Sequence, residues 1–321
     1  MPESPDCLLC GESAFEVVLD DVRDLVWRKE GRFTLQRCCE CGLVMTRPRP
    51  TAEELTTYYE DAYSGRGEQA EAKRKGATSL MVRLLGAFRM TAIGRGRSLR
   101  AEDHVLDVGC SYGGFLKVLR DEVGCRTSGI DFDAGSIAGA IEPERCDYRS
   151  GTLLEAGYEG GSFSVVTFIE CLEHDPHPLD SLEEAHRVLA DEGIVVVEVP
   201  SWDGAWRQVF GRFWLPLLVP QHLVHFRPAS LRAAMEQAGF EVLHLQSMFF
   251  PLEGVASLWL WLVDLLDIPP LGAEPTWRTP LHVLLFASLI VPLWFLVEVP
   301  SQLLLRLVGR SGHVLAVGKK Q

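Results

Sequence analysis

The spacing of apolar positions changes along the chain and predicts three kinds of structure. Short alternating runs at Phe15–Leu19 and Arg32–Gln36 predict strands, which Arg47–Pro50 brings to an end. Residues 51–98 carry apolar positions at helical spacing. From Val105 onward apolar runs alternate with helical stretches, a pattern typical of βαβ units around a parallel sheet. We therefore expect an α/β core preceded by a small β-rich module and a helical linker.

The apolar runs of the core have the length of buried strands. The predicted strands are Val105–Val108, Thr127–Asp131, Val165–Ile169, Ile194–Val199, Val242–Gln246 and His313–Val317. Before the last of them, residues 249–310 break the rhythm with long apolar segments. We expect this part to be an apolar helical insertion.

Charge and cysteine content narrow the class of protein. The 31 Lys and Arg against 44 Asp and Glu give a net charge of −13, which repels a phosphate backbone, so we expect no nucleic-acid partner. The start, Met1–Asp6, has neither the basic nor the apolar segment of a signal peptide. We therefore expect a cytoplasmic protein, in which spaced cysteines bind metal more often than they form disulfides.

Two copies of the motif C-x-x-C-G predict a metal site. Cys7 and Cys10 precede Gly11, and Cys38 and Cys41 precede Gly42. Each turn lets two thiolates face one ion, so the two motifs together make a four-sulfur zinc site. Since all four ligand positions are filled by cysteine, zinc here would be structural. The alternative is a set of reduced cysteines without metal.

A glycine loop and a following acid predict a nucleoside cofactor. A strand runs into Asp107-x-Gly109-x-x-x-Gly113 and then into a helix, and the next strand ends at Asp131, where a carboxylate can accept both ribose hydroxyls. The acid at position 107 would repel the pyrophosphate of a dinucleotide. Through water it could instead meet the ammonium of an amino-acid moiety, which favours S-adenosylmethionine as the cofactor.

From this loop onward the chain resembles the class I S-adenosylmethionine-dependent methyltransferases, over residues 100–247 and the last strand. The stretches 163–178 and 182–200 look like the fourth strand, helix and fifth strand of that family. The resemblance implies a Rossmann-like α/β fold with a seven-stranded sheet. It also implies roles for the cofactor-binding residues: the methionine part at Asp107, Gly109, Cys110, Ser111 and Gly113, the ribose at Asp131, the adenine at Phe132 and Thr152, and the sulfur region at Glu170.

The cysteine motifs and Thr57–Tyr59 resemble a subgroup in which a zinc module precedes the methyltransferase fold, the sugar C-methyltransferase and ubiquinone-methyltransferase-like group. Where that group has a Glu-His pair, this chain has Gln221-His222. A lone histidine can still remove a hydroxyl proton near pH 7, so we expect the catalytic residues to be among His222, His174 and Gln221, and oxygen rather than carbon to be methylated. The alternative is that either ring only supports its loop through hydrogen bonds.

The insertion predicts contact with a membrane. The 17 residues from Leu281 to Val297 could just cross a hydrocarbon core of about 30 Å. The Lys- and Arg-rich stretch 66–100 could face anionic headgroups. Six tryptophans suit an interfacial setting: Trp206, Trp214, Trp259, Trp261, Trp277 and Trp294.

The expected protein is a methyltransferase bound peripherally or monotopically to the cytoplasmic membrane face, with a lipid-like or lipid-linked small-molecule acceptor. The alternatives are a soluble deoxysugar C-methyltransferase whose insertion forms a homodimer or a lid, and a SAM-fold binding protein without catalysis. The expected domains are a zinc module (1–50), a helical linker (51–98), the SAM-binding core (99–248), the apolar insertion (249–310), and the last strand and tail (311–321).

Overall fold

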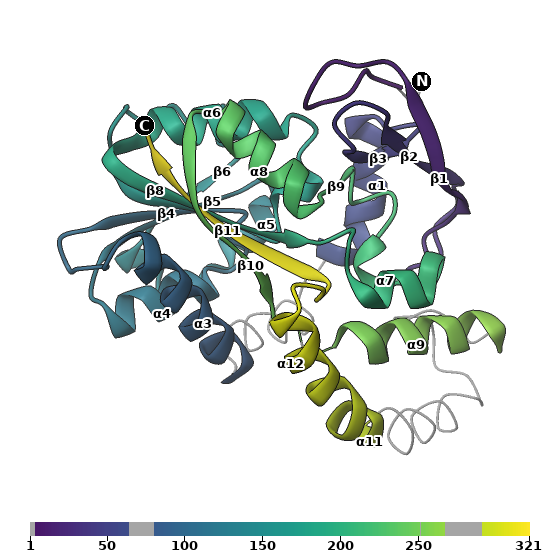
Figure 1. The fold of residues 1–321 in the computed structure, drawn as a ribbon. Coiled ribbons are helices and arrows are strands. Elements are labelled where there is room, and N and C mark those ends of the chain that lie inside the picture. Colours follow the sequence, from purple (N-terminus) through teal and green to yellow (C-terminus); the bar gives the residue numbers. More distant parts are fainter. Residues whose placement is uncertain (1–3, 64–79, 251, 267–290) are drawn as a thin grey trace. The chain divides into compact units, whose positions relative to one another are not determined.

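The computed structural model describes residues 4–63, 80–250, 252–266 and 291–321, which form two compact units (Figure 1). Each unit collects segments that are far apart in the sequence. The module unit comprises Met1–Tyr58, Pro200–Ser230 and Gln246–Val314, and the core unit comprises Tyr59–Val199, Leu231–Leu245 and Leu315–Gln321. The domain boundaries expected from the sequence concern which parts of the chain fold on their own. They stay predictions.

The core is built on a seven-stranded sheet with the order β10-β11-β8-β7-β4-β5-β6. Its strands are β4 (His104–Val108), β5 (Arg126–Asp131), β6 (Asp147–Ser150), β7 (Phe163–Ile169), β8 (Leu189–Pro200), β10 (Phe240–Met248) and β11 (His313–Lys320). The strands from β4 to β8 pair in parallel, with β4 between β5 and β7. The predicted Rossmann-like α/β fold is confirmed.

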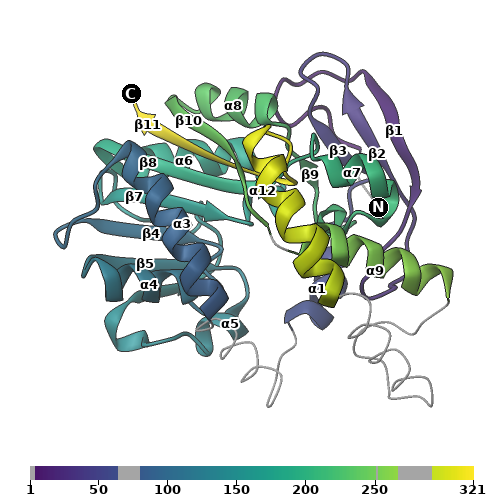
Figure 2. The same ribbon diagram turned by 60° about the horizontal axis from the view of Figure 1, so that its bottom comes forward.

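Helices cover both faces of this sheet, so its central strands are apolar on both sides. The helices α3 (Leu80–Gly96) and α4 (Gly114–Glu122) lie on one face, and α6 (Pro178–Val188) lies on the other (Figure 2). The run Ile194–Val197 in β8 is fully buried. Burial of each such side chain contributes about 1.5–3 kcal/mol, and the strand reads as a continuous apolar run for this reason.

The module unit contains a four-stranded sheet with the order β1-β2-β3-β9. Its strands are β1 (Phe15–Val22), β2 (Phe33–Cys38), β3 (Val44–Arg47) and β9 (Val224–His225), and all three pairings are antiparallel. The first three are the predicted β-rich module. The fourth strand, β9, lies nearly 180 residues later in the sequence, so the sheet is complete only when the chain returns to it.

The remaining elements connect and cover these sheets. They are α1 (Ala52–Tyr63), α5 (Ala134–Ala138), α7 (Ala205–Phe210), α8 (Pro228–Gln237), α9 (Glu253–Leu265), α11 (Val291–Leu293) and α12 (Val299–Leu307), the 3-10 turns η1 (Pro143–Arg145), η2 (Leu172–His174), η3 (Gly211–Phe213) and η4 (Leu215–Leu217), and the π-helical turn η6 (Trp294–Glu298).

Two buried acids tie the insertion together. Glu253, at the start of α9, accepts hydrogen bonds from Trp214 Nε1 (2.6 Å) and Gln302 Nε2 (2.8 Å). Glu298 accepts from the N–H groups of Gly254 (3.0 Å) and Val255 (3.1 Å) and so caps the first turn of α9. These bonds hold α9 to η6 and α12.

Trp214 corrects one expectation. It is 1% exposed and belongs to the hydrophobic core of the module unit, so it does not occupy an interfacial setting. Trp261 is 42% exposed, whereas Trp277 lies outside the described residues. Residues 281–290 of the long apolar run also lie outside them. In the part of the chain that the structure describes, no helix has both the length and the apolar character needed to span a bilayer.

Candidate functional site

The glycine loop leaves β4 at the carboxyl edge of the core sheet and leads directly into α4. Gly109 and Gly113 have φ values of 77° and 78°, in the left-handed region that favours glycine. A Cβ added to Gly113 would lie 1.8 Å from the Tyr148 hydroxyl, so no other residue fits there. The loop therefore brings the N-terminal N–H groups of α4 to the same edge, where they suit a polar ligand.

Asp131 ends the neighbouring strand β5 and is fixed by two backbone bonds. Its Oδ2 accepts from the N–H of Ser111 (2.8 Å), within the glycine loop, and its Oδ1 accepts from the N–H of Asp133 (2.9 Å). A carboxylate has about four lone-pair directions, so each oxygen keeps one for a ligand. Burial raises the pKa of Asp131. A rigid carboxylate with two lone pairs available fits a ribose diol.

Asp107 lies one residue before the end of β4 and is 3% exposed. Its Oδ1 accepts a hydrogen bond of 2.6 Å from Thr167 Oγ1 on β7. Burial raises its pKa to about 7, although Thr167 and the charge of Arg89 oppose this shift. Burial therefore favours the protonated form of this carboxyl in the free protein.

A buried ion pair stands beside these acids and was not predicted from the sequence. Arg89 of α3 donates from Nε (2.7 Å) and Nη2 (3.1 Å) to the carboxylate of Glu198, near the end of β8. Burial lowers the pKa of Arg89, but the negative charges of Glu198, Glu170 and Asp107 raise it more. Because Asp107 and Asp131 are buried as well, carboxylates outnumber cations at this edge. Such a set of groups fits a cationic ligand.

Tyr59 and His174 form a second pair in the core unit. The Tyr59 hydroxyl lies 3.1 Å from Nδ1 of His174, in the turn η2 that follows β7. The Tyr59 ring also packs against Phe132, with ring centroids 5.1 Å apart, while Phe132 keeps half of its surface exposed. The structure thus brings His174 and Phe132 to one tyrosine whose role the sequence did not reveal.

Three further residues named from the sequence lie along the same edge. Glu170 follows β7 with a positive φ of 52°, and its N–H donates to the Glu198 carbonyl (2.8 Å). Cys110 is buried within the glycine loop. Thr152 is exposed after β6, where its hydroxyl donates to Glu155 (2.8 Å).

Gln221 and His222 lie in the module unit. His222 is buried, and its Nδ1 donates to the carbonyl of Pro216 (2.8 Å), so Nε2 is the basic nitrogen of the neutral ring. Gln221 is also buried, and its Nε2 donates to the Tyr58 carbonyl (2.8 Å). Both side chains hold their loop through backbone carbonyls. Their catalytic role stays a prediction.

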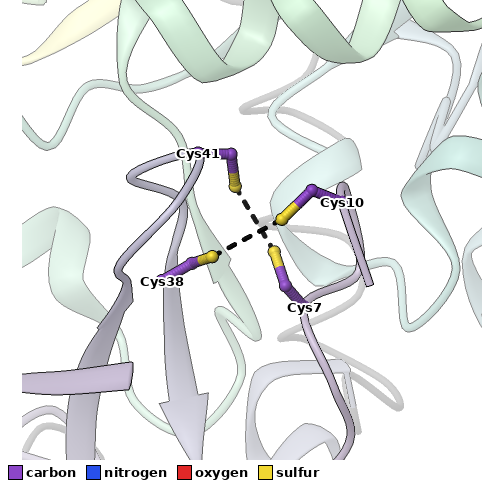
Figure 3. A group of neighbouring side chains, drawn as sticks. All are labelled: Cys7, Cys10, Cys38 and Cys41. Atoms are coloured by element: carbon purple, nitrogen blue, oxygen red, sulfur yellow. Dashed lines mark hydrogen bonds between the residues drawn. The ribbon is translucent and has the colours of Figure 1, made fainter. Parts of the chain in front are cut away.

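The four cysteines of the two motifs converge in the module unit (Figure 3). Cys7 Sγ lies 3.4 Å from Cys41 Sγ, Cys10 Sγ lies 3.5 Å from Cys38 Sγ, and all four sulfurs are within 4.8 Å of one another. In both motifs the glycine N–H donates to the carbonyl of the first cysteine (2.8 and 3.1 Å). Zn–S bonds of about 2.3 Å place tetrahedral sulfurs about 3.8 Å apart, so this cluster fits zinc.

The fold and the carboxyl-edge site define a class I S-adenosylmethionine-dependent methyltransferase. Residues 79–245, just over half of the chain, match the family described as Methyltransferase domain, and the chain belongs to that family.

Two curated relatives match part of the chain. It is 33% identical over 164 residues to the ubiquinone biosynthesis O-methyltransferase of Azorhizobium caulinodans. This match covers 47% of the present chain and 64% of the relative. It is 31% identical over 150 residues to the protein of that name from Pseudomonas aeruginosa, covering 43% and 64%. The chain thus spans less than two thirds of the length of these relatives.

A solved structure supports the fold alone. The Galdieria sulphuraria protein named as a sarcosine dimethylglycine methyltransferase matches with a TM-score of 0.50 and 14% identity, covering 83% of this chain and 97% of that one.

We predict that S-adenosylmethionine binds more tightly as the pH rises from 6 to 8. A cationic ligand favours the ionised form of Asp107, and because its pKa in the free protein is raised to about 7, binding below that pH must release a proton. Calorimetry should show affinity falling by up to about tenfold per pH unit below 7. Asp107→Asn should bind more weakly with little pH dependence, whereas Glu102→Gln, at an exposed acid, should keep the slope. A flat wild-type profile would contradict the assignment.

Proposed function

We propose that the protein transfers a methyl group from S-adenosylmethionine to a hydroxyl oxygen of a small acceptor, with His174 as the base. When bound, the cofactor supplies an electrophilic methyl carbon on its sulfonium. The observation that carries the proposal is the Tyr59–His174 pair, in the same unit as the loop and acids that suit the cofactor.

The transfer requires one proton to leave the acceptor hydroxyl as its oxygen bonds to the methyl carbon and the carbon–sulfur bond breaks. In this proposal Nδ1 of His174 donates to the Tyr59 hydroxyl, 3.1 Å away, which leaves Nε2 to take the proton. The contact with Tyr59 orients the ring. The name O-methyltransferase of two relatives favours oxygen as the acceptor atom.

We further propose that the acceptor is lipid-like or lipid-linked and is met at the cytoplasmic membrane face. The helical insertion exposes several large apolar side chains, and an apolar surface of this kind is typical of an interaction site. They are Leu252 just before α9, Trp261, Leu265 and Leu266 at and after its end, and Leu296, Val297, Leu303, Leu304, Leu307 and Val308 along and just after η6 and α12.

The basic stretch 66–100 contributes less to this proposal than its composition indicates. Within the core unit, Arg83, Arg89, Arg97 and Arg100 each have an acidic partner. Their charges are therefore compensated. Attraction to the membrane rests on the apolar side chains of the insertion.

The cysteine cluster holds a structural zinc ion in this proposal. Cys7 is buried, and burial raises the pKa of its thiol to about 11, so forming the thiolate costs free energy. A bound cation would remove this cost. The four-stranded sheet of the module unit is small and buries little apolar surface, and a bound metal would add stability to it.

The catalytic proposal predicts that His174→Gln lowers kcat by about 10²-fold or more, because the base is lost. Tyr59→Phe should lower kcat less and shift the pH profile, because the ring loses its orienting partner. The measurement is S-adenosylhomocysteine release with a panel of phenols and hydroxylated prenyl lipids. His177→Gln, at an exposed histidine three residues on, should match the wild type. Equal kcat in His174→Gln would exclude His174 as the base.

The membrane proposal predicts that the protein floats with anionic liposomes and that Leu304→Ser/Leu307→Ser does not. Val17→Ser, at an apolar residue of β1 about as exposed as Leu304, should float like the wild type. If the double variant instead turns a dimer into a monomer and no form floats, the exposed face is a subunit interface and the membrane proposal is wrong.

The metal proposal predicts one zinc per chain in elemental analysis. Cys10→Ser should lose the metal and lower the melting temperature, because only three thiolates are left. Cys39→Ser, at the exposed cysteine beside Cys38, should keep both at wild-type values. A chain without zinc, or zinc that survives Cys10→Ser, would refute the four-cysteine site.

A further inference from the structure

We propose that Thr167 is a positioning residue for the cofactor: its hydroxyl donates a hydrogen bond to Asp107 when that carboxyl is ionised and accepts one from it when it is protonated. Thr167 thereby sets how readily Asp107 loses its proton to receive a cationic ligand. The inference rests on the proposed function, because it takes the methionine part of S-adenosylmethionine to lie at Asp107. Thr167 acts through that carboxyl and not on the ligand itself.

Thr167 and Asp107 are neighbours across two parallel strands. They are paired in the register of β7 and β4, so their side chains point to the same face of the sheet. Thr167 is 0% exposed and Asp107 is 3% exposed, so the contact between them is removed from water. The Thr167 hydroxyl lies 2.6 Å from Asp107 Oδ1 and 3.3 Å from the carbonyl oxygen of Leu106.

This hydroxyl has one proton and two acceptors within reach. A threonine hydroxyl is one donor with two lone pairs, so it can change partners by rotating. With Asp107 ionised, the hydroxyl donates to Oδ1, and 2.6 Å lies within the range of about 2.5–2.7 Å for such charge-assisted bonds. With Asp107 protonated, the carboxyl O–H donates to Thr167, and the hydroxyl donates to Leu106. Rotation of one hydroxyl therefore serves both charge states without moving either strand.

The groups that face Asp107 make its charge depend on the ligand. Arg89 of α3 favours the ionised form, whereas burial and the charge of Asp131 on β5 favour the protonated form. The thiols of Cys110, in the glycine loop, and Cys171, after β7, also face it, and burial followed by the nearby acids raises the pKa of both. They stay neutral and supply no positive charge. Burial outweighs Arg89 and raises the pKa of Asp107 to about 7, and a bound ammonium would lower it.

Removal of the hydroxyl should therefore weaken cofactor binding at low pH only. In Thr167→Val the ionised carboxyl loses a stronger hydrogen bond than the protonated one does, because charge-assisted bonds are roughly twice as strong as neutral ones. The pKa of Asp107 then rises, and binding near pH 6 must release a proton that is held more tightly. Well above that pKa the carboxyl is ionised in both proteins, so their affinities converge.

The experiment is calorimetry of S-adenosylmethionine binding to the full-length chain from pH 6 to 8.5, read as the ratio of variant to wild-type affinity, in which titration of the ligand cancels. Thr167→Val should bind about five- to tenfold more weakly at pH 6 and within about twofold of the wild type at pH 8.5. Thr167→Ala, a second variant without the hydroxyl, should give the same profile. Thr167→Ser, which keeps the hydroxyl, should restore the wild-type profile.

Thr127→Val is the matched control. It makes the same change at a buried threonine of β5, whose hydroxyl accepts from Arg120 Nη1 (3.0 Å), and should leave the affinity ratio independent of pH. In the Asp107→Asn background Thr167→Val should add no pH dependence, because an amide does not titrate.

The outcomes separate this inference from the proposed function. If Thr167→Val weakens binding equally at every pH, or not at all, the hydroxyl only supports the fold and the inference is wrong, while cofactor binding stands. A pH-dependent effect of Thr167→Val that persists with Asp107→Asn would place the titrating group elsewhere and would equally overturn it. A wild-type chain that does not bind S-adenosylmethionine would overturn the proposed function together with this inference.

Discussion

The burial of carboxylates at the carboxyl edge of the core sheet is the constraint on which the site depends. Asp107 and Asp131 are almost fully buried, and burial raises the pKa of both. Moving a charge out of water costs several kcal/mol unless another charge or several hydrogen bonds compensate it. Arg89 compensates Glu198, and Thr167 and the loop N–H groups compensate the others only in part. A ligand that carries a sulfonium and an ammonium supplies the missing positive charge, so the same desolvation that destabilises the free site favours the cofactor.

The strands that could be predicted from the sequence are those with a recognisable local pattern of residues. In β4, β7 and β8 the side chains are covered on both faces, so each contains a run of apolar residues. β5 has the sequence RTSGID and could be predicted because it ends at the acid that follows the glycine loop. β6 was not predicted, because its four residues lie at the sheet edge and are polar. β9 has only two residues, and its pairing with β3 joins parts of the chain that nothing local connects.

The same distinction separates the site residues. Asp107, Gly109 and Asp131 could be predicted because a strand, a turn and the next strand place them through local geometry. The contacts of Tyr59 with His174 and of Arg89 with Glu198 could not, because each joins residues more than 100 positions apart in the sequence. Gln221 and His222 were predicted together with His174, yet they belong to the other unit, which includes residues 200–230. The roles of the loop residues and of the catalytic candidates both stay predictions.

The measurement that tests the account most directly is S-adenosylmethionine binding by calorimetry to the wild type and to Asp131→Asn. The wild type should bind one molecule per chain. The variant should bind at least about tenfold more weakly, since an amide offers one oxygen where the carboxylate offers two, and its circular dichroism should be unchanged. Equal affinity in the two proteins would contradict the placement of the ribose at Asp131, and with it the cofactor site described above.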